Sequence, residues 1–295
     1  MTSRSKRRGV KPSVVFSVVV LVFAGCASFG NFVNNGEDVV FDADADRNIE
    51  KGEAAMTAKN YAEAARYFEF VKTKYPYLEV AKTAELRLGD CDFERERYTE
   101  ARDRFSSFVR LHPTHPKVDY AAFRAALTHY KDIPSDFFIL PPSTEKDQVE
   151  VKNALAAMVE FTRSYPESSH VKEAQVAIVD VKRRLAEHEL YVADFYAKRG
   201  RWPAVVTRLS VIAKDYGGIG YDERAYFGMS DAWKQQKNGA KAAEALRTFV
   251  TKYPNDPAAK KAEAVLASKE LEKLEPPPSA QPTPPAAKSS PDAGS

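Results

Sequence analysis

Residues 110–130 read RLHPTHPKVDYAAFRAALTHY, and the first four of them, RLHP, recur in related forms along the chain. Equivalent endings stand at TKYP 73–76, RSYP 163–166, KDYG 214–217 and TKYP 251–254. Each has Tyr or His followed by proline or glycine, residues that stop a helix. The five endings therefore divide the chain into five units, and residues 110–130 contain the joint between the second unit and the third.

Counting backwards from the last residue of each ending reveals columns of like residues. Eight residues before the ending lie Phe68, Phe105, Met158, Leu209 and Leu246. Five residues before it lie Val71, Phe108, Phe161, Ile212 and Phe249. Twelve residues before it lie Ala64, Ala101, Ala154, Val205 and Ala242. Apolar positions three to four apart line one face of a helix, so each unit ends in a helix with one buried face.

Two further columns complete the repeat, and the second of them lies in a helix that precedes the one just described. Fifteen residues before the ending lie Tyr61, Tyr98, Val151, Trp202 and, against the trend, Gly239. Twenty-four residues before it lie the small residues Gly52, Gly89, Ala193 and Ser230, where two helices are expected to cross closely. This register is that of the tetratricopeptide repeat, two antiparallel helices in about 34 residues. We therefore predict an all-α superhelical solenoid of five such repeats, stacked to share one core and to form a concave groove.

The third unit departs from the register. Its small residue becomes Ala126 if sixteen residues are inserted, and the proline-broken segment 133–148 has that length. After Pro166 the segment 169–199 contains no proline or glycine, so we predict one long helix joining repeats 3 and 4. The repeats are expected at about 45–76, 82–113, 119–166, 186–217 and 223–254, with a capping helix at 257–274.

The two ends of the chain differ from this array. Five basic residues and an apolar run, 14–23, lead to Ala24-Gly25-Cys26, which is typical of a signal peptide spanning 1–25. Cysteine after two small residues resembles the lipobox of bacterial lipoproteins, so Cys26 is expected to become the N-palmitoyl, S-diacylglycerol cysteine at the start of a tether, 26–44. Removing five positive charges from a net +3 leaves −2, and no basic surface for nucleic acid is implied. The proline-rich residues 275–295 are expected to be disordered.

Motifs for catalysis or metal binding are missing from the sequence. It has no phosphate-binding glycine loop, HExxH or zinc-type Cys/His spacing. Asp42, Asp44 and Asp46 resemble the start of a calcium loop, but Arg47 stands where glycine is needed, so we interpret them as acids that favour the positive N-terminal end of the first helix. His112 and His115 have no third ligand nearby; we interpret His112 as the aromatic position of the joint and expect His115 to form a loop hydrogen bond. We therefore expect no enzyme activity, no metal and no cofactor besides the lipid on Cys26.

A binding groove is the more informative prediction. Positions of the first helix that tend to face the concave side in such repeats are apolar or aromatic in the first three units: Met56, Leu86, Phe93, Tyr120, Phe123, Leu127 and Tyr130. In the last two units they are mostly charged: Asp194, Lys198, Arg224, Phe227, Asp231 and Lys234. An aromatic groove could hold an extended peptide with hydrophobic anchors. The alternative is that these side chains pack between adjacent helices.

Residues 110–130, the insertion with Phe137 and Phe138, the turn FTRSYPESSH 161–170 and the segment AEHELYVADFYAKRGRW 186–202 together resemble the BamD (YfiO-type) family of tetratricopeptide lipoproteins. That family belongs to the outer-membrane β-barrel assembly machine, the BAM complex. The resemblance covers roughly residues 45–254 and includes the irregular spacing of the units.

The resemblance implies a non-catalytic scaffold that is lipid-anchored in the outer membrane and faces the periplasm. Its C-terminal repeats would bind the last POTRA domain of the BamA subunit, with Arg199, Arg201, Trp202, Tyr226 and Trp233 as candidate contacts. Its N-terminal repeats would receive C-terminal segments of unfolded outer-membrane proteins. Two other classes stay open: a pilotin-like repeat lipoprotein for secretin or pilus assembly, and a periplasmic repeat adaptor of the Tol-Pal system.

Overall fold

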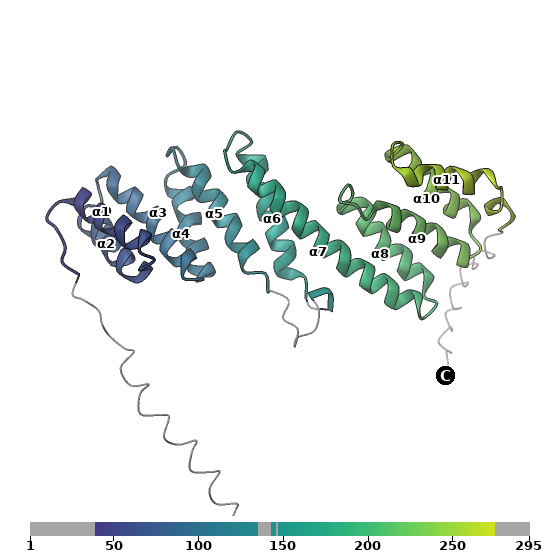
Figure 1. The fold of residues 1–295 in the computed structure, drawn as a ribbon, viewed down its shortest axis with the longest axis horizontal. Coiled ribbons are helices and arrows are strands. Elements are labelled where there is room, and N and C mark those ends of the chain that lie inside the picture. Colours follow the sequence, from purple (N-terminus) through teal and green to yellow (C-terminus); the bar gives the residue numbers. More distant parts are fainter. Residues whose placement is uncertain (1–38, 135–142, 146, 275–295) are drawn as a thin grey trace, which may run out of the picture.

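The computed structural model describes residues 39–134, 143–145 and 147–274. Its helices lie side by side in one elongated row from α1 to α11 (Figure 1). The bounds are α1 Ala45–Thr57, α2 Tyr61–Lys74, α3 Glu79–Glu94, α4 Tyr98–Leu111, α5 Val118–Lys131, α6 Val149–Ser164, α7 Val171–Ala197, α8 Trp202–Asp215, α9 Asp222–Gln235, α10 Gly239–Lys252 and α11 Pro257–Ala267. Short 3₁₀ turns follow α5 at Ser143–Glu145 (η1) and α11 at Leu271–Lys273 (η2). Within the described ranges the chain is all-helical, as predicted.

The five predicted breaks all fall at helix ends. The residue before each proline or glycine is the C-cap of α2, α4, α6, α8 or α10: Tyr75, His112, Tyr165, Tyr216 and Tyr253. Their φ angles lie between −121° and −131°, outside the helical region, so the chain turns there. His112 is therefore a joint residue, as we interpreted it.

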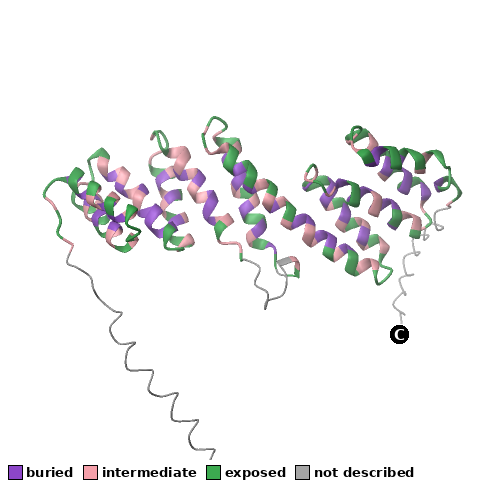
Figure 2. Cartoon of the chain, in the orientation of Figure 1, coloured by how far each residue is buried: buried purple, intermediate pink, exposed green. Residues whose placement is uncertain are grey.

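The sequence columns form the core between paired helices. Ala64, Ala101 and Ala154 are fully buried, as are Phe68 and Phe105 (Figure 2). The structure shows why the residues at the predicted helix crossings are small. A Cβ added to Gly52 would lie 2.5 Å from the Phe68 ring, and one added to Gly89 would lie 2.7 Å from the Phe105 ring. The glycine of the first helix thus makes room for the aromatic side chain of the second.

The irregular third unit also has the predicted layout. Helices α5 and α6 are separated by residues 132–148, of which 135–142 and 146 lie outside the described part. The long helix α7 has 27 residues and packs against α6 and against α8, so it belongs to two hairpins. No helix in the described ranges is both long enough and apolar enough to span a bilayer. The predicted leader, 1–25, most of the tether and the tail, 275–295, also lie outside the described residues.

The predicted capping helix is shorter than expected. The segment starts as a helix, α11, but the helix ends at Ala267, and Lys269 has a left-handed φ of 54°. The chain then folds back in η2 and buries Leu271 against α10. A Cβ on Gly239 would lie only 1.7 Å from the Leu271 carbonyl oxygen, so only glycine fits there. This contact explains why Gly239 breaks the aromatic column.

Candidate binding surfaces

The predicted aromatic groove is mostly interior. Leu86, Phe93, Phe123 and Leu127 are 3–8% exposed and belong to the hydrophobic core. Only Met56, Tyr120 and Tyr130 of the seven predicted groove residues are half-buried. The four side chains therefore pack between adjacent helices, which is the alternative reading; Phe93, for example, packs against Tyr98 of α4, and Phe123 against Phe161 of α6. They cannot supply a solvent-facing apolar groove in this conformation.

A polar network joins the first three units instead. Arg87 on α3 lies 2.5 Å from Glu53 on α1 and 3.1 Å from Asp90 one turn further along α3. Asp90, 3% exposed, accepts a 2.6 Å hydrogen bond from the Tyr120 hydroxyl on α5. Arg124 on α5 lies 3.2 Å from the same carboxylate and stacks 3.9 Å above the Phe93 ring. Burial and the neighbouring Asp90 carboxylate raise the pKa of Tyr120, so the hydroxyl stays a donor.

The same kind of bridge continues along the later units. The pairs are Tyr130 with Asp180 at 3.1 Å, Tyr221 with Glu187 at 2.5 Å, Arg224 with Asp194 at 2.8 Å and Lys261 with Glu223 at 3.2 Å. We call this set, together with the bridges from Glu53 to Arg124, the inter-repeat ladder. Each bridge joins the first helix of one unit, or the residue preceding it, to the first helix of the next. The ladder therefore makes a polar surface where the sequence predicted an apolar one in the N-terminal half.

The candidate contacts of the C-terminal half are only partly exposed. Arg199 and Arg201 are exposed in the turn between α7 and α8, and Trp202 is half-buried. Trp233 is half-buried too, with the Lys241 ammonium 4.5 Å from its ring centroid. Tyr226 is 6% exposed. Its ring packs against those of Phe249 and Tyr253, so placing Tyr226 at an interface was wrong.

Sequence reasoning missed two exposed aromatic residues beside this turn. Tyr191 is 42% exposed and Phe195 is 43% exposed, and the Arg199 guanidinium stacks 3.5 Å above the Phe195 ring. Tyr191 and Phe195 are four residues apart on α7 and so share a face, and Arg199 reaches that face from the turn that follows. That spacing was available in the sequence, but the buried face of α7 had to be known before this one could be identified as free.

The histidines and aspartates that suggested metal sites have structural partners. The His112 ring nitrogen Nε2 lies 2.9 Å from Glu85 Oε2, and His115 Nδ1 accepts a 3.1 Å hydrogen bond from the Lys117 backbone. The loop hydrogen bond expected for His115 is therefore present.

Asp44 caps α1 by accepting from the backbone of Asp46 and Arg47. Across the described residues, no cluster of three or more His, Cys, Asp or Glu side chains could hold a metal ion.

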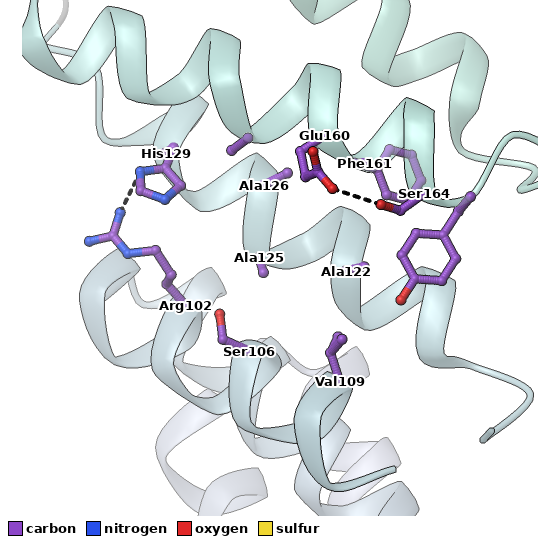
Figure 3. A pocket seen from close by; sticks show the side chains of 12 residues that line it. Arg102, Ser106, Val109, Ala122, Ala125, Ala126, His129, Glu160, Phe161 and Ser164 are labelled. Carbon is purple, nitrogen blue, oxygen red and sulfur yellow. Dashed lines mark hydrogen bonds between the residues drawn. The ribbon is translucent and has the colours of Figure 1, made fainter. Parts of the chain in front are cut away.

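A surface hollow of about 370 Å³ lies over α5, between α4 and α6 (Figure 3). Four alanine side chains line it: Ala122, Ala125, Ala126 and Ala157. Val109 and Phe161 line one end, and Arg102 and His129 line the other (Figure 3). We call this site the alanine hollow. Its lining is mostly apolar, with polar groups at its ends, which is typical of a ligand site.

The charge at the alanine hollow is uneven. Arg102 Nη1 lies 2.9 Å from His129 Nδ1, and no carboxylate among the described residues forms an ion pair with Arg102. Burial and the neighbouring Arg102 lower the pKa of His129, so the imidazole is neutral and accepts from the guanidinium. Glu160 is engaged by Arg163 at 2.5 Å and by the Ser164 hydroxyl at 2.9 Å. The Arg102 end of the hollow therefore carries an unpaired positive charge.

Comparison with known proteins assigns the family. The model of the YfiO family, described as outer membrane lipoprotein, matches residues 42–244. The outer membrane protein assembly factor BamD of Neisseria meningitidis serogroup B is 24% identical over 239 residues, covering 80% of this chain and 89% of the relative. The protein of the same name from Haemophilus influenzae is 27% identical over 231 residues, covering 77% and 85%. The protein of that name from Caulobacter vibrioides is 24% identical over 244 residues, covering 78% and 75%.

Since the family model spans more than half of the chain and these relatives align over most of their own length, the family is established. The relatives are named as assembly factors and not as enzymes, in agreement with a scaffold. The chain belongs to the YfiO family of outer membrane lipoproteins, and its relatives indicate an outer membrane protein assembly factor of the BamD type.

Proposed function

We propose that the protein is a non-catalytic scaffold of the BAM complex, anchored by lipid on Cys26 and facing the periplasm. The cysteine after Ala24 and Gly25 supports the anchor, and the family description supports the membrane. The observation that carries the scaffold role is the unbroken row of paired helices, which offers long surfaces to partners. Repeat arrays of this kind act mainly by binding other proteins.

The turn between α7 and α8 binds the POTRA domain of BamA in this proposal. Arg199, Arg201 and Trp202 lie there, and Tyr191 and Phe195 add exposed aromatic area on α7. Arginine and aromatic residues dominate the binding energy of many protein interfaces. An exposed cluster of both types therefore supports this surface over the C-terminal half in general, and Tyr226 is removed from it.

Trp202→Ala combined with Arg199→Glu is expected to abolish co-purification of a POTRA-containing barrel protein from detergent-solubilised membranes. Arg247→Glu, a charge reversal at an exposed position of α10, serves as the matched control and should leave co-purification unchanged. Circular dichroism verifies that both proteins remain helical. Intact co-purification by the double variant would exclude this surface.

The N-terminal half receives unfolded outer-membrane proteins in the same proposal. The accessible members of the predicted groove, Met56, Tyr120 and Tyr130, support it, with the polar ladder beside them. Phe93→Ala and Phe123→Ala are poor tests, because truncating such buried rings costs about 3–5 kcal/mol of stability.

Tyr130→Ala is the cleaner variant, since Asp180, the partner of Tyr130, keeps Arg184 at 3.1 Å. We expect it to weaken binding of a peptide that ends in phenylalanine, measured by fluorescence anisotropy. Tyr191→Ala, an aromatic truncation on α7, should bind that peptide as the parent does. Equal affinities of Tyr130→Ala and the parent would remove Tyr130 from the substrate surface.

A further inference from the structure

Charged pairs lie at the position of the alanine hollow in other units. In the second unit, Arg104 on α4 lies 2.6 Å from the buried Asp92 on α3 and 4.0 Å from Glu69 on α2. The guanidinium thus spans the space between two neighbouring second helices. In the fourth unit, Arg208 on α8, nine residues before its break like Arg104, lies 3.3 Å from the buried Glu189 on α7. Both units place an arginine and a carboxylate here, and the hollow of about 330 Å³ that remains in the second unit is lined mostly by polar and charged side chains, among them Lys72, Glu85 and Arg104.

The third unit lacks both partners. Counting from the breaks, and allowing for the sixteen-residue insertion, Ala157 stands where Arg104 and Arg208 stand. His129 takes the place of Asp92, and Ala122 takes the place of Glu189. In the fifth unit the equivalent first-helix positions hold the large rings of Tyr226 and Trp233. What distinguishes the third unit is therefore the lining of its hollow, since small alanine side chains stand where the second unit has Glu85 and Arg104.

The second unit supplies the alanine hollow with a charge that has no equivalent in the other units. Arg102 stands eleven residues before its break, where the other units have Ala65, Leu155, Val206 and Ala243. Arg87, Arg97, Arg104, Arg124 and Arg208, the other arginines that hold the described first and second helices together, each pair with a carboxylate. Arg102 has only the neutral His129. A carboxylate arriving from outside would complete the pair that the neighbouring units form internally.

We propose that the alanine hollow binds an extended segment of a partner protein, with an aspartate or glutamate side chain on Arg102 and the next apolar side chains over the alanines. A volume of about 370 Å³ is at the lower end of the range for ligand pockets, about 300–1,000 Å³, and suits two apolar side chains. The charges at the two ends of the hollow decide which end receives the acidic side chain of the segment. Glu160 stands toward the other end, and Asp132 and Glu150, whose charges act on His129, do not line the hollow. Arg102 is therefore the lining group that attracts an acid.

The α5 members of the ladder, Tyr120, Arg124 and Tyr130, do not line this site, and it lies away from the α7–α8 turn. It therefore goes beyond the proposed function, and neither of the surfaces proposed above is needed for it. A third surface would allow the scaffold to hold an additional partner while its ends are occupied.

The test uses the full chain labelled with ¹³C at alanine methyl groups and the peptide acetyl-Ser-Asp-Leu-Leu-Ser-amide. We expect saturable shifts of the methyl signals of Ala122, Ala125, Ala126 and Ala157, with Ala64 and Ala242 unmoved. The same peptide with asparagine for aspartate should bind at least about tenfold more weakly, because the charged hydrogen bond is lost. Unmoved methyl signals at millimolar peptide would overturn the proposal.

Two variants make the result specific. Arg102→Gln should lose the preference for aspartate over asparagine, whereas Arg110→Gln, on the same helix but outside the hollow, should keep it. The double variant Ala157→Arg with His129→Asp copies the Arg104–Asp92 pair. It places an arginine among the alanines and a carboxylate beside Arg102, and should abolish the shifts. If Arg102→Gln keeps the preference, or if the double variant binds as the parent does, the site is wrong.

Two alternative occupants give different outcomes. Stronger binding of acetyl-Ser-Ser-Leu-Leu with a free C-terminal carboxylate than of the aspartate peptide would replace our proposal with capture of a chain end. Shifts of the hollow methyl signals that grow with protein concentration, without peptide, would instead identify a second copy of the chain as the occupant.

Discussion

Gly52 and Gly89 show how single residues set the spacing of the array. Each stands on the first helix of its unit, directly against the phenylalanine ring of the second, Phe68 or Phe105. The corresponding residues of later units, Ala126, Ala193 and Ser230, are also small, so one requirement recurs. In the sequence these residues form a column, but only the structure shows which ring fills the space.

Gly89→Ala is expected to destabilise the protein by about 1–3 kcal/mol, because the added Cβ would lie 2.7 Å from a fully buried ring that has little room to move. Urea unfolding followed by circular dichroism measures the loss. The smaller side chain of Phe105→Leu, combined with Gly89→Ala, should recover part of it relative to the sum of the single variants. Strict additivity of the two changes would contradict the close contact.

At the scale of the helical hairpin, the turn between the two helices has nearly the same backbone conformation in the first, second, fourth and fifth units. Lys59, Glu96, Gly200 and Lys237 stand seventeen residues before their breaks, and all have a left-handed φ between 55° and 66°. The residue after each donates to a carbonyl five residues earlier, as in Asn238 to Trp233 at 2.9 Å. This is the Schellman ending of a helix, which favours glycine. Only the fourth unit has glycine, so sequence alone gave no signal for the turn.

Lys237→Gly should stabilise the protein by about 0.5–1 kcal/mol, because glycine adopts the left-handed conformation without the strain of a Cβ. Thermal unfolding by calorimetry tests this. The opposite substitution at the equivalent position, Gly200→Ala, should lower the melting temperature although nothing lies within 4 Å of the added methyl group. A lower melting temperature for Lys237→Gly would show that the lysine side chain matters more than its backbone strain.

Across the whole molecule, the inter-repeat ladder connects the first helices of successive units through polar bridges, in addition to the contacts of their cores. Asp90 is its most connected member, with Arg87, Tyr120 and Arg124 all on one buried carboxylate. Because each unit of a solenoid touches only its neighbours, a loss at this point separates the first two units from the rest.

Asp90→Ala is expected to cost about 3–5 kcal/mol, since it leaves two arginines without their buried partner. It should also broaden the urea transition as the units on either side of α3 unfold less cooperatively. Asp231→Ala, which removes an exposed carboxylate 2.7 Å from Lys234, is the control and should cost less than about 1 kcal/mol. A sharp transition for Asp90→Ala would show that the apolar core alone couples the units.

The sequence by itself determined the helices, their pairing, the joints at the five breaks and the long helix α7, because a repeated pattern of apolar and small residues permits only one way to bury each face. It also determined the family, since the irregular spacing of the units is as distinctive as the repeat. The tertiary structure decided what is exposed. Phe93 and Phe123 occupy positions that could face a groove, but their neighbours cover them, and a ladder of charges takes the surface instead. The alanine hollow likewise depends on small side chains that lie on separate helices. Its lining comes from α4, α5 and α6, so it exists only once packing brings these three helices together.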